Sequence, residues 1–355
     1  MTTSADPPSA VLARPNAANE GLSPERAARS GIDVLALGFG ASVAMWAVGY
    51  VSHLPGVGAP GWITLPLMLA CLFAGGAAAG RTAEAGFARG AMVGLVAGLV
   101  NLLILGSLLL DPETKSVMPS ALIWLPGSLL LHAVIAGAGA ALFRDKEAAL
   151  RSPADWRSAL AGVAVVATFL VVIAGGLVTS FEAGLAVDDW PNTFGTNMFL
   201  YPLARMTGGI YYEHAHRLYG ALVGLTTVVL AFTIWFGEER RWVRRLALAA
   251  VVMVIVQGLM GGLRVTGSFT LAVDPASEPI LPLAITHGVF GQMFFAVMVV
   301  LFSATTRFWR MAEKPQPHEK ALTDYGLTKW LLAVIILQIA LGAVYRHTYT
   351  TENPI

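Results

Sequence analysis

The chain has 355 residues, of which 56% are hydrophobic and only 13% are charged. Soluble domains typically carry about 25% charged residues, so this composition excludes an ordinary soluble protein and indicates a membrane protein. The formal net charge of +1 gives no electrostatic basis for binding nucleic acid, and a single cysteine, Cys71, excludes a disulfide or a cysteine-based metal site within one chain.

Residues 1–30 form the first distinct segment. They are rich in Ala, Pro, Ser and Asn, and they lack the basic-then-apolar order of a cleaved signal sequence. A segment this poor in large apolar residues cannot bury enough surface to fold by itself. We therefore expect a disordered cytoplasmic tail.

Nine apolar segments follow the tail, and each is close to the roughly 20 residues that a helix needs to cross about 30 Å of hydrocarbon. Because helices satisfy their own backbone hydrogen bonds in lipid, the sequence predicts an all-α fold, a polytopic membrane helix bundle built from four-helix-bundle units. The segments are 32–54, 61–80, 90–110, 119–143, 158–178, 211–236, 246–266, 282–304 and 327–346.

Lysine and arginine residues concentrate in alternate loops between these segments. The loop between the sixth and seventh segments holds Arg240, Arg241, Arg244 and Arg245, whereas the loops on the other side hold few basic residues. Basic loops stay on the cytoplasmic side of a membrane. The pattern predicts a multi-pass protein of a bacterial-type inner (cytoplasmic) membrane, with a cytoplasmic N-terminus and residue 355 on the outer side.

The first four apolar segments make up the predicted N-terminal domain, residues 31–145, whose role the sequence does not indicate. Its many glycine and alanine residues permit close approach of helices. His132 lies inside the fourth segment, where a lone histidine is more often a hydrogen-bonding group between helices than a ligand. The charged stretch 144–157 marks the boundary to the next domain.

The second part of the chain is predicted to contain a four-helix bundle at 158–306 and, at 327–355, the start of a second, incomplete bundle. Two long segments, 179–210 and 267–281, connect helices on the outer side. Long connections without elements of their own are often functional, so we expect the outer face to be the working face. The acidic pair at 188–189 is expected to be solvated.

The strongest local signal is a Glu-His-Ala-His-Arg stretch that ends at Arg217 and opens the sixth segment. A carboxylate, two imidazoles and a guanidinium this close to lipid are costly to bury and usually indicate function. Glu213 and His216 are three residues apart and share one helix face, whereas His214 points elsewhere. The stretch therefore predicts a site built on Glu213 and His216.

A second histidine, His287, opens the eighth segment. It is predicted to lie at the same depth as His216, roughly one to two turns below the outer surface. Two such histidines on neighbouring helices can ligate one heme iron from opposite sides; two interfacial histidines that match by chance are the alternative. Gly220 and Gly224 follow His216 on its helix face and would leave room for something flat and bulky.

Arginines near the outer ends of the segments are candidate partners for heme propionates, because guanidinium groups pair well with carboxylates. Extension of these long side chains to lipid headgroups is the alternative. We favour a site role for Arg217, next to His216, and a surface position for Arg205. The candidates are Arg205, Arg217, Arg264 and Arg346.

Several motifs of the second half occur together in chain order, and in this combination residues 158–350 resemble the heme A synthase family. The motif that joins a glutamate to a His-Arg pair, with an upstream Asp-Trp-Pro, is the most specific part of the resemblance. The motifs are Gly175-Gly176-Leu177-Val178-Thr179, Ala183-Gly184-Leu185, Asp189-Trp190-Pro191, Glu213-x-x-His216-Arg217 with Gly220, Gly261-Gly262 and the His287 segment.

The resemblance implies an activity that composition does not indicate. The family oxidises the C8 methyl group of heme O to a formyl group, giving heme A for terminal oxidases. Its fold is two similar four-helix bundles, one for the substrate heme O and one for a heme b cofactor, each offering a histidine pair.

By motif match, Glu213 corresponds to the functionally important acid of the family, and His216 and His287 correspond to one histidine pair that ligates heme iron. The implied partners are heme O, a quinol or other electron donor, the lipid bilayer, and heme O synthase or oxidase assembly proteins.

The chain departs from the family pattern at two points. Segment 179–210 has no cysteine pair, and no second histidine pair follows the ninth segment, which ends near His347. Three explanations of the second departure stay open: an incomplete sequence, which we favour; a protein that works with one bundle; or the N-terminal domain acting as the partner bundle.

Two other functions remain as alternatives. One is a non-enzymatic bis-histidine cytochrome b that carries electrons, and the other is a heme-free transporter or assembly factor. Glu213 favours the enzyme over the cytochrome, since an axial ligand needs no acid beside it. The pair of His216 and His287 favours either heme function over the transporter.

Overall fold

In the computed structural model, the described residues are 31–82, 86–109, 111, 116–145, 155–267, 280–312 and 320–348. The predicted tail at 1–30 and most of the outer segment 267–281 lie outside these ranges.

Nine helices among the described residues are long and apolar enough to cross a membrane. They coincide with the nine predicted segments, so the predicted all-α polytopic membrane bundle is confirmed. The helices are α2 (Ile32–His53), α3 (Gly61–Thr82), α4 (Phe87–Leu105), α5 (Ala121–Leu142), α7 (Trp156–Ser180), α8 (Gly208–Gly237), α9 (Arg241–Thr266), α10 (Leu281–Thr305) and α12 (Ala321–Thr348).

Short elements occupy the connections between these helices. An antiparallel pair of two-residue strands lies in the segment between α7 and α8, which we call the outer segment after its predicted side, so that segment is more ordered than a plain loop. The short elements are η2 (Gly106–Leu109), β1 (Asn192–Thr193), β2 (Thr196–Asn197), η3 (Met198–Leu200), η4 (Leu203–Arg205) and α11 (Arg307–Met311).

Local chemistry explains several helix ends. α9 begins at Arg241, earlier than the predicted 246, because arginine side chains can extend toward headgroups while their backbone stays helical. The same helix stops at Gly267, whose φ of 67° is a left-handed conformation that glycine adopts without strain. α10 carries Pro282 in its first turn, where a missing amide hydrogen leaves no hydrogen bond unmade.

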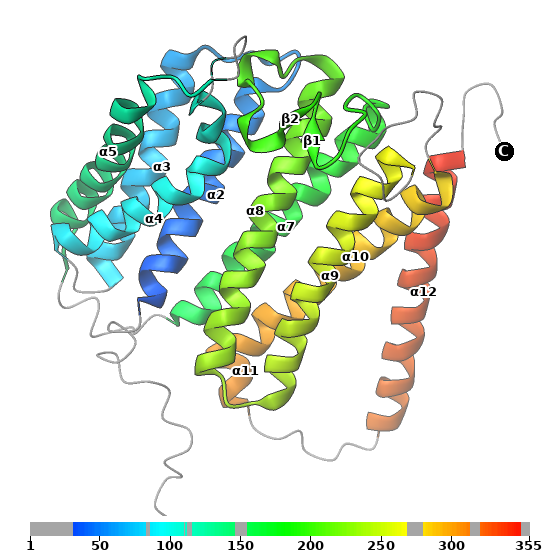
Figure 1. Cartoon of the computed structure of the whole chain (residues 1–355). Helices are drawn as coiled ribbons and strands as arrows, with labels where there is room; N and C mark the ends of the chain where they lie inside the picture. Colours follow the sequence, from blue (N-terminus) through cyan, green and yellow to red (C-terminus); the bar gives the residue numbers. More distant parts are fainter. Residues whose placement is uncertain are drawn as a thin grey trace, which may run out of the picture.

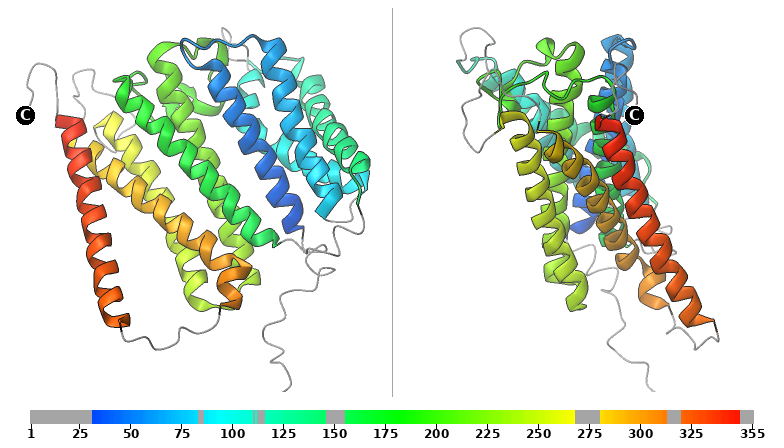
Figure 2. Two further views of the ribbon diagram at one scale, coloured as in Figure 1. Left: turned by 180° about the vertical axis from the view of Figure 1, so that it is seen from behind. Right: turned by 90° about the vertical axis from the view of Figure 1, so that its right-hand side faces the viewer.

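The long helices form two groups with one helix at the edge (Figure 1). Helices α2 to α5 pack against one another, and α7 to α10 form a closed ring in which α7 and α9 each contact α8 and α10. α2 joins the groups by packing along α7. α12 packs against α10 at the edge far from α2–α5, as Figure 2 shows from behind.

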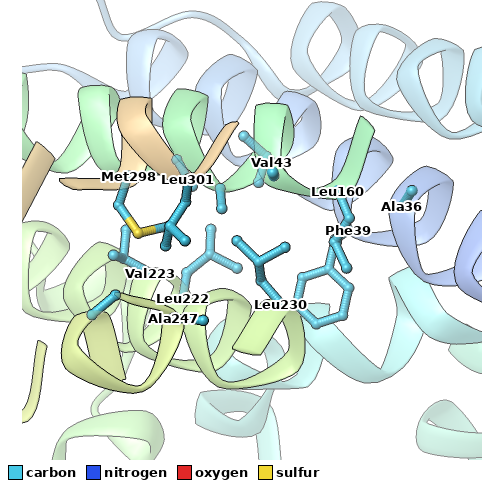
Figure 3. Close-up of a cluster of buried hydrophobic side chains, with 14 of the residues drawn as sticks. Ala36, Phe39, Val43, Leu160, Leu222, Val223, Leu230, Ala247, Met298 and Leu301 are labelled. Carbon is cyan, nitrogen blue, oxygen red and sulfur yellow. The ribbon is translucent and has the colours of Figure 1, made fainter. Parts of the chain in front are cut away.

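One apolar core runs from α2 through the ring of α7 to α10 (Figure 3). Phe39 of α2 and Leu160 of α7 belong to the same cluster as Leu222 of α8 and Met298 of α10, and all four are buried. Such packing stabilises helix association in lipid through close van der Waals contact. The core therefore crosses the predicted boundary at 144–157 and fastens the two groups together.

A polar network lies inside the first group. Trp46 Nε1 of α2 donates to Asn101 Oδ1 of α4 at 3.0 Å, and Asn101 Nδ2 lies 3.0 Å from His132 Nε2 of α5. The other ring nitrogen of His132 lies 2.7 Å from the Ser128 carbonyl oxygen. His132 thus links helices by hydrogen bonds, as its sequence position predicts.

Aromatic side chains line the joint between the two groups. Tyr211 of α8 donates a hydrogen bond from its hydroxyl to the Tyr50 carbonyl oxygen of α2 at 2.6 Å. The ring of Tyr219 packs edge-on against Trp46 and Tyr50, with ring centres 5.5 Å apart in both pairs. The helix that begins with the Glu-His-Ala-His-Arg stretch is therefore held directly by α2.

The opposite end of the ring is fixed by an ion pair at the turn between α8 and α9. Arg240 donates to both carboxylate oxygens of Glu238 at 2.8–2.9 Å and to the Ala304 carbonyl oxygen of α10 at 2.7 Å. Burial would raise the pKa of the Glu238 carboxyl, but hydrogen bonds from Arg240 outweigh burial and hold that pKa below its usual value.

Candidate functional site

A cavity of about 690 Å³ lies between the helices of the ring, at the end where α8 and α10 begin. The outer end of α12 and three residues of the outer segment, Trp190, Pro191 and Met198, complete its wall. This volume falls in the range of roughly 300–1,000 Å³ found for small-molecule and cofactor sites. Four residues singled out from the sequence line it together: Glu213, His216, Arg217 and His287.

The two histidines face each other across this cavity. The ring centres of His216 and His287 are 6.4 Å apart, and the ring planes cross at 84°. A metal bound between two imidazole nitrogens, at roughly 2 Å from each, separates the ring centres by about 6 Å. The spacing therefore fits two axial ligands on opposite sides of one iron.

The hydrogen bonding of these rings is incomplete. Nδ1 of His216 and Nδ1 of His287 are both buried, and neither has a hydrogen-bond partner in the described part of the chain. Nearly all buried polar atoms in proteins are paired, so an orphaned one needs an explanation. Two imidazoles at metal-bridging distance, each with an unpartnered nitrogen, fit a bound heme, whose iron takes histidine ligands.

A glycine on the preceding helix accommodates each of these rings. A Cβ at Gly175 of α7 would lie 2.9 Å from Cε1 of His216, and a Cβ at Gly261 of α9 would lie 3.0 Å from Cε1 of His287. Contacts this short require the ring to move. The α7–α8 and α9–α10 pairs thus repeat one arrangement, in which a glycine on one helix leaves room for a histidine ring on the next. This explains why glycine stands at these two positions of the sequence motifs.

Gln257 of α9 fastens the second histidine further. Its Nε2 donates to the His287 carbonyl oxygen at 2.9 Å and lies 3.5 Å from His287 Nε2. Gln257 was not singled out from the sequence, because a lone amide inside an apolar segment carries no spacing signal. It restricts the orientation of α10 relative to α9 at the depth of the histidine pair.

Glu213 reaches the cavity with one carboxylate oxygen unpaired. Oε1 accepts a hydrogen bond from Arg217 Nε at 3.1 Å, and Oε2 is buried without a partner among the described residues. The side chains of both residues are only 5–6% exposed. A buried carboxylate is costly unless it is compensated, and Arg217 supplies that compensation while leaving Oε2 available.

Arg217 also binds the outer segment. Its guanidinium donates to the carbonyl oxygens of Val187, Asp189 and Asn192 at 2.9, 2.6 and 3.0 Å. Together with the bond to Glu213, these contacts use four of its five N–H groups. Pairing of Arg217 with a propionate stays a prediction, and the structure gives this side chain a role in holding the segment over the site.

The segment held in this way forms the outer wall of the cavity. The Trp190 ring lies in the space that a Cβ at Gly262 of α9 would occupy. The Asp189 carboxylate accepts hydrogen bonds from the amides of Phe194 and Gly195 at 2.8 and 2.7 Å. The pair at 188–189 is open to solvent as expected, with Asp188 exposed and Asp189 partly exposed, and the Asp189 carboxylate in addition closes the turn that carries Trp190.

Some of the remaining residues from the sequence analysis lie away from the cavity, and others line it. His214 faces away from the cavity, with Nδ1 at 3.0 Å from the Thr193 hydroxyl, as expected. Gly220 lines the cavity but Gly224 does not, and Arg205 is exposed outside it. Three further polar residues line the cavity at its outer end: Arg264, Arg346 and His347.

Residues 158–352 match the COX15-CtaA family of cytochrome oxidase assembly proteins. Among curated relatives, heme A synthase of Lysinibacillus sphaericus is 29% identical over 196 residues, which cover 52% of this chain and 56% of the relative. Heme A synthase of Alkalihalophilus pseudofirmus is 27% identical over 190 residues, covering 52% and 58%. Heme A synthase of Beijerinckia indica is 26% identical over 219 residues, covering 55% and 58%.

No solved structure matches the chain. The chain spans somewhat more than half the length of the curated relatives it matches. Since the family match covers more than half of the 355 residues, the chain belongs to the COX15-CtaA family of cytochrome oxidase assembly proteins, which includes the heme A synthases.

Proposed function

We propose that this protein is a heme A synthase-like membrane oxidoreductase that oxidises the C8 methyl group of heme O to a formyl group for terminal oxidase biogenesis. The observation that carries the proposal is the pair of histidine rings, with ring centres 6.4 Å apart and each with one unpartnered nitrogen, in one cavity with an unpaired buried carboxylate oxygen of Glu213. Family membership and relatives named heme A synthase support it.

In this proposal His216 and His287 hold the iron of a heme in the cavity, either heme O as substrate or heme b as cofactor. A heme held there would supply the redox chemistry. Conversion of the methyl to a formyl group removes four electrons from the carbon; in the proposed reaction two molecules of dioxygen accept these and four more electrons donated by two quinols or an equivalent donor, one oxygen atom enters the product, and three molecules of water are released. The protein contributes the position and orientation of the heme.

Glu213 is proposed as the catalytic acid. Glu213 lines the cavity, and its buried Oε2 has no partner among the described residues; a carboxylate in this position can take up a proton released during oxidation or stabilise positive charge that develops on the carbon. Arg217 holds Oε1 and so fixes the orientation of the carboxylate. Neither Glu213 nor Arg217 is proposed to bind iron.

Exclusion of water is the proposed role of the outer segment. Trp190 and Pro191 line the cavity, and Arg217 fastens the carbonyl groups on either side of them. A closed outer wall strengthens electrostatic interactions inside the site and limits side reactions. Arg217 therefore holds both the outer segment and the Glu213 carboxylate in place.

The proposed setting is a bacterial-type inner membrane with the N-terminus in the cytoplasm and the cavity toward the outer side. We keep the division into a four-helix domain at 31–145, a heme-binding bundle at 158–306 and a further unit that begins at 327–355. Heme O synthase or oxidase assembly proteins are the proposed partners.

The test is extraction and chromatography of heme from the purified protein, expressed in cells supplied with heme O. Heme A in the extract is expected for the wild type. Glu213→Gln, which keeps the size of the side chain and an acceptor for Arg217, is expected to retain heme and to lower heme A formation by roughly a hundred-fold or more.

Other outcomes would replace the proposal. Bound heme b or heme O with no heme A, in the wild type as in Glu213→Gln, would indicate a bis-histidine cytochrome. Full activity of Glu213→Gln would show that the acid is misassigned. Absence of heme from the wild type would favour a heme-free transporter or assembly factor.

A further inference from the structure

The charged residues that line the cavity do not balance. Among the described lining residues there are one carboxylate, that of Glu213, and three guanidinium groups, those of Arg217, Arg264 and Arg346. Three positive charges less one negative charge leave a formal excess of +2. Arg217 is hydrogen-bonded to Glu213, and Arg264 interacts with the same carboxylate only electrostatically, so most of the excess resides on Arg264 and Arg346.

Arg264 lies on the last turn of α9 and reaches the centre of the site. Its Nε is buried and has no hydrogen-bond partner among the described residues. It lies near enough to His216, His287 and His347 to interact electrostatically with all three. A buried guanidinium nitrogen without an acceptor is costly, and an anion beside it would remove that cost.

The position of this guanidinium is set by Gly184 in the outer segment. A Cβ at Gly184 would occupy the space taken by the terminal nitrogen Nη2 of Arg264. In return, Trp190 of the same segment occupies the space above Gly262 of α9. The segment and α9 therefore interlock, so Arg264 is held in place rather than free to extend to headgroups.

Arg346 approaches the same end of the cavity from the edge helix α12. It donates a hydrogen bond to the Thr179 carbonyl oxygen of α7 at 2.5 Å, which brings its guanidinium across the cavity mouth. Its neighbour His347 also lines the cavity. Although α12 packs mainly against α10, its outer end thus supplies one of the two uncompensated positive charges.

We propose that Arg264 and Arg346 form a two-arginine clamp that selects a ligand with two carboxylates along one edge, one for each guanidinium. The proposal rests on the proposed function, because the ligand is a heme with its two propionates. Guanidinium groups bind carboxylates through paired hydrogen bonds. Arg264 orients the macrocycle between the two histidines, and Arg346 makes α12 part of the binding site.

The test compares two ligands that differ only at the carboxylates: heme b and its dimethyl ester. The purified full chain, freed of heme, is titrated with each ligand, and binding is followed by the visible absorption of the bis-histidine heme. Wild-type protein is expected to bind the free acid roughly ten-fold or more tightly than the diester, since hydrogen bonds between charged groups are strong.

Variants then locate the source of that preference. Arg264→Gln is expected to weaken binding of the free acid and to leave diester binding unchanged, so most of the preference disappears. Arg346→Gln should remove a smaller part, because its side chain is exposed and solvent screens the interaction. Arg205→Gln, outside the cavity, is the matched control and should retain the full preference.

A further variant changes geometry without changing charge. Gly184→Ala displaces the Arg264 guanidinium and should reduce the preference for the free acid, while diester binding reports that the site remains folded. An equal loss for both ligands in Arg264→Gln and Gly184→Ala would mean a structural role and would overturn the clamp.

Failure of the clamp and failure of the proposed function give different results. Wild-type protein that binds both ligands equally, with a bis-histidine spectrum, would overturn the clamp and leave the function standing. Binding of neither ligand would overturn both.

Discussion

The two helix groups differ in what some of their glycines face. In the first group, a Cβ at Gly94 of α4 or at Gly139 of α5 would collide with the backbone of the facing helix, so these glycines bring backbones into contact. In the second group, Gly175 and Gly261 face imidazole rings of residues that line the cavity. Gly98 of the first group also faces side chains, so the difference lies in the backbone contacts of Gly94 and Gly139.

The buried histidines differ in the same way. Both ring nitrogens of His132 in the first group have hydrogen-bond partners, whereas His216 and His287 each leave Nδ1 without one. A satisfied polar network stabilises a specific helix arrangement. His214 also leaves a buried ring nitrogen, Nε2, without a partner among the described residues, but it does not line the cavity. An unpartnered ring nitrogen therefore points to a ligand here only where the histidine also lines the cavity, as His216 and His287 do.

The largest expected effect tests the difference between the cavity histidines and His132. His216→Ala or His287→Ala should abolish heme retention in the purified protein, because each change removes one of the two proposed iron ligands. His132→Ala should retain heme, although the protein loses stability through the unpaired Asn101. Heme content per polypeptide, measured from the absorption of extracted heme, checks all three variants. Heme retained in His216→Ala would place the ligand elsewhere.

The next effect compares two buried ion pairs. Arg217→Leu should lower the free energy of unfolding by about 3–5 kcal/mol, because it leaves Glu213 buried and uncompensated and removes three contacts to the outer segment. Arg89→Leu strands the fully buried Asp33 of the first group, a carboxylate at least as buried as that of Glu213. It should cost less only because Arg217→Leu removes the three backbone contacts in addition. Thermal unfolding followed by helical circular dichroism measures both, and an equal loss would contradict the ranking.

Most of the fold could be predicted from the sequence. Apolar length alone located the nine helices, because a bilayer imposes one length on every spanning helix. The ordered outer segment could not be predicted, because its shape depends on contacts from elsewhere in the chain. Arg217 binds three of its carbonyl groups, and Gly262 provides space for Trp190; neither contact leaves a periodic pattern.

The candidate site was predictable where chemistry is unusual for a membrane. Glu213, His216 and His287 are costly in lipid, so they were identified by type, and the structure brings them into one cavity. Gln257 gave no such signal. Arg264 gave an ambiguous one, since an arginine at a helix end can extend to headgroups as well as line a site. Only the unpartnered Nε of Arg264 and the position of its guanidinium against Gly184 favour a place in the site over extension to headgroups.

A smaller effect tests the close backbone contact of the first group. Gly94→Ala should lower the free energy of unfolding by roughly 1–3 kcal/mol, because the new Cβ meets the backbone carbonyl of His132, which cannot rotate away. Cys71 is the only cysteine of the chain and lies half-buried in α3. The rate at which a thiol reagent labels Cys71 therefore reports opening of this group. Unchanged labelling would mean that α4 and α5 are not closely packed.

The smallest effect concerns the glycines that accommodate the histidine rings. Gly175→Ala or Gly261→Ala should weaken heme binding about ten-fold, equivalent to about 1.4 kcal/mol, because the added methyl group displaces a ring that must meet the iron at a fixed angle. Gly224→Ala is the matched control, since its Cβ would meet nothing within 4 Å. Heme titration of the three variants measures the effect. If Gly175→Ala and Gly224→Ala bind heme equally well, Gly175 does not set the position of the His216 ring, and the proposed difference between the glycines of the two groups is wrong.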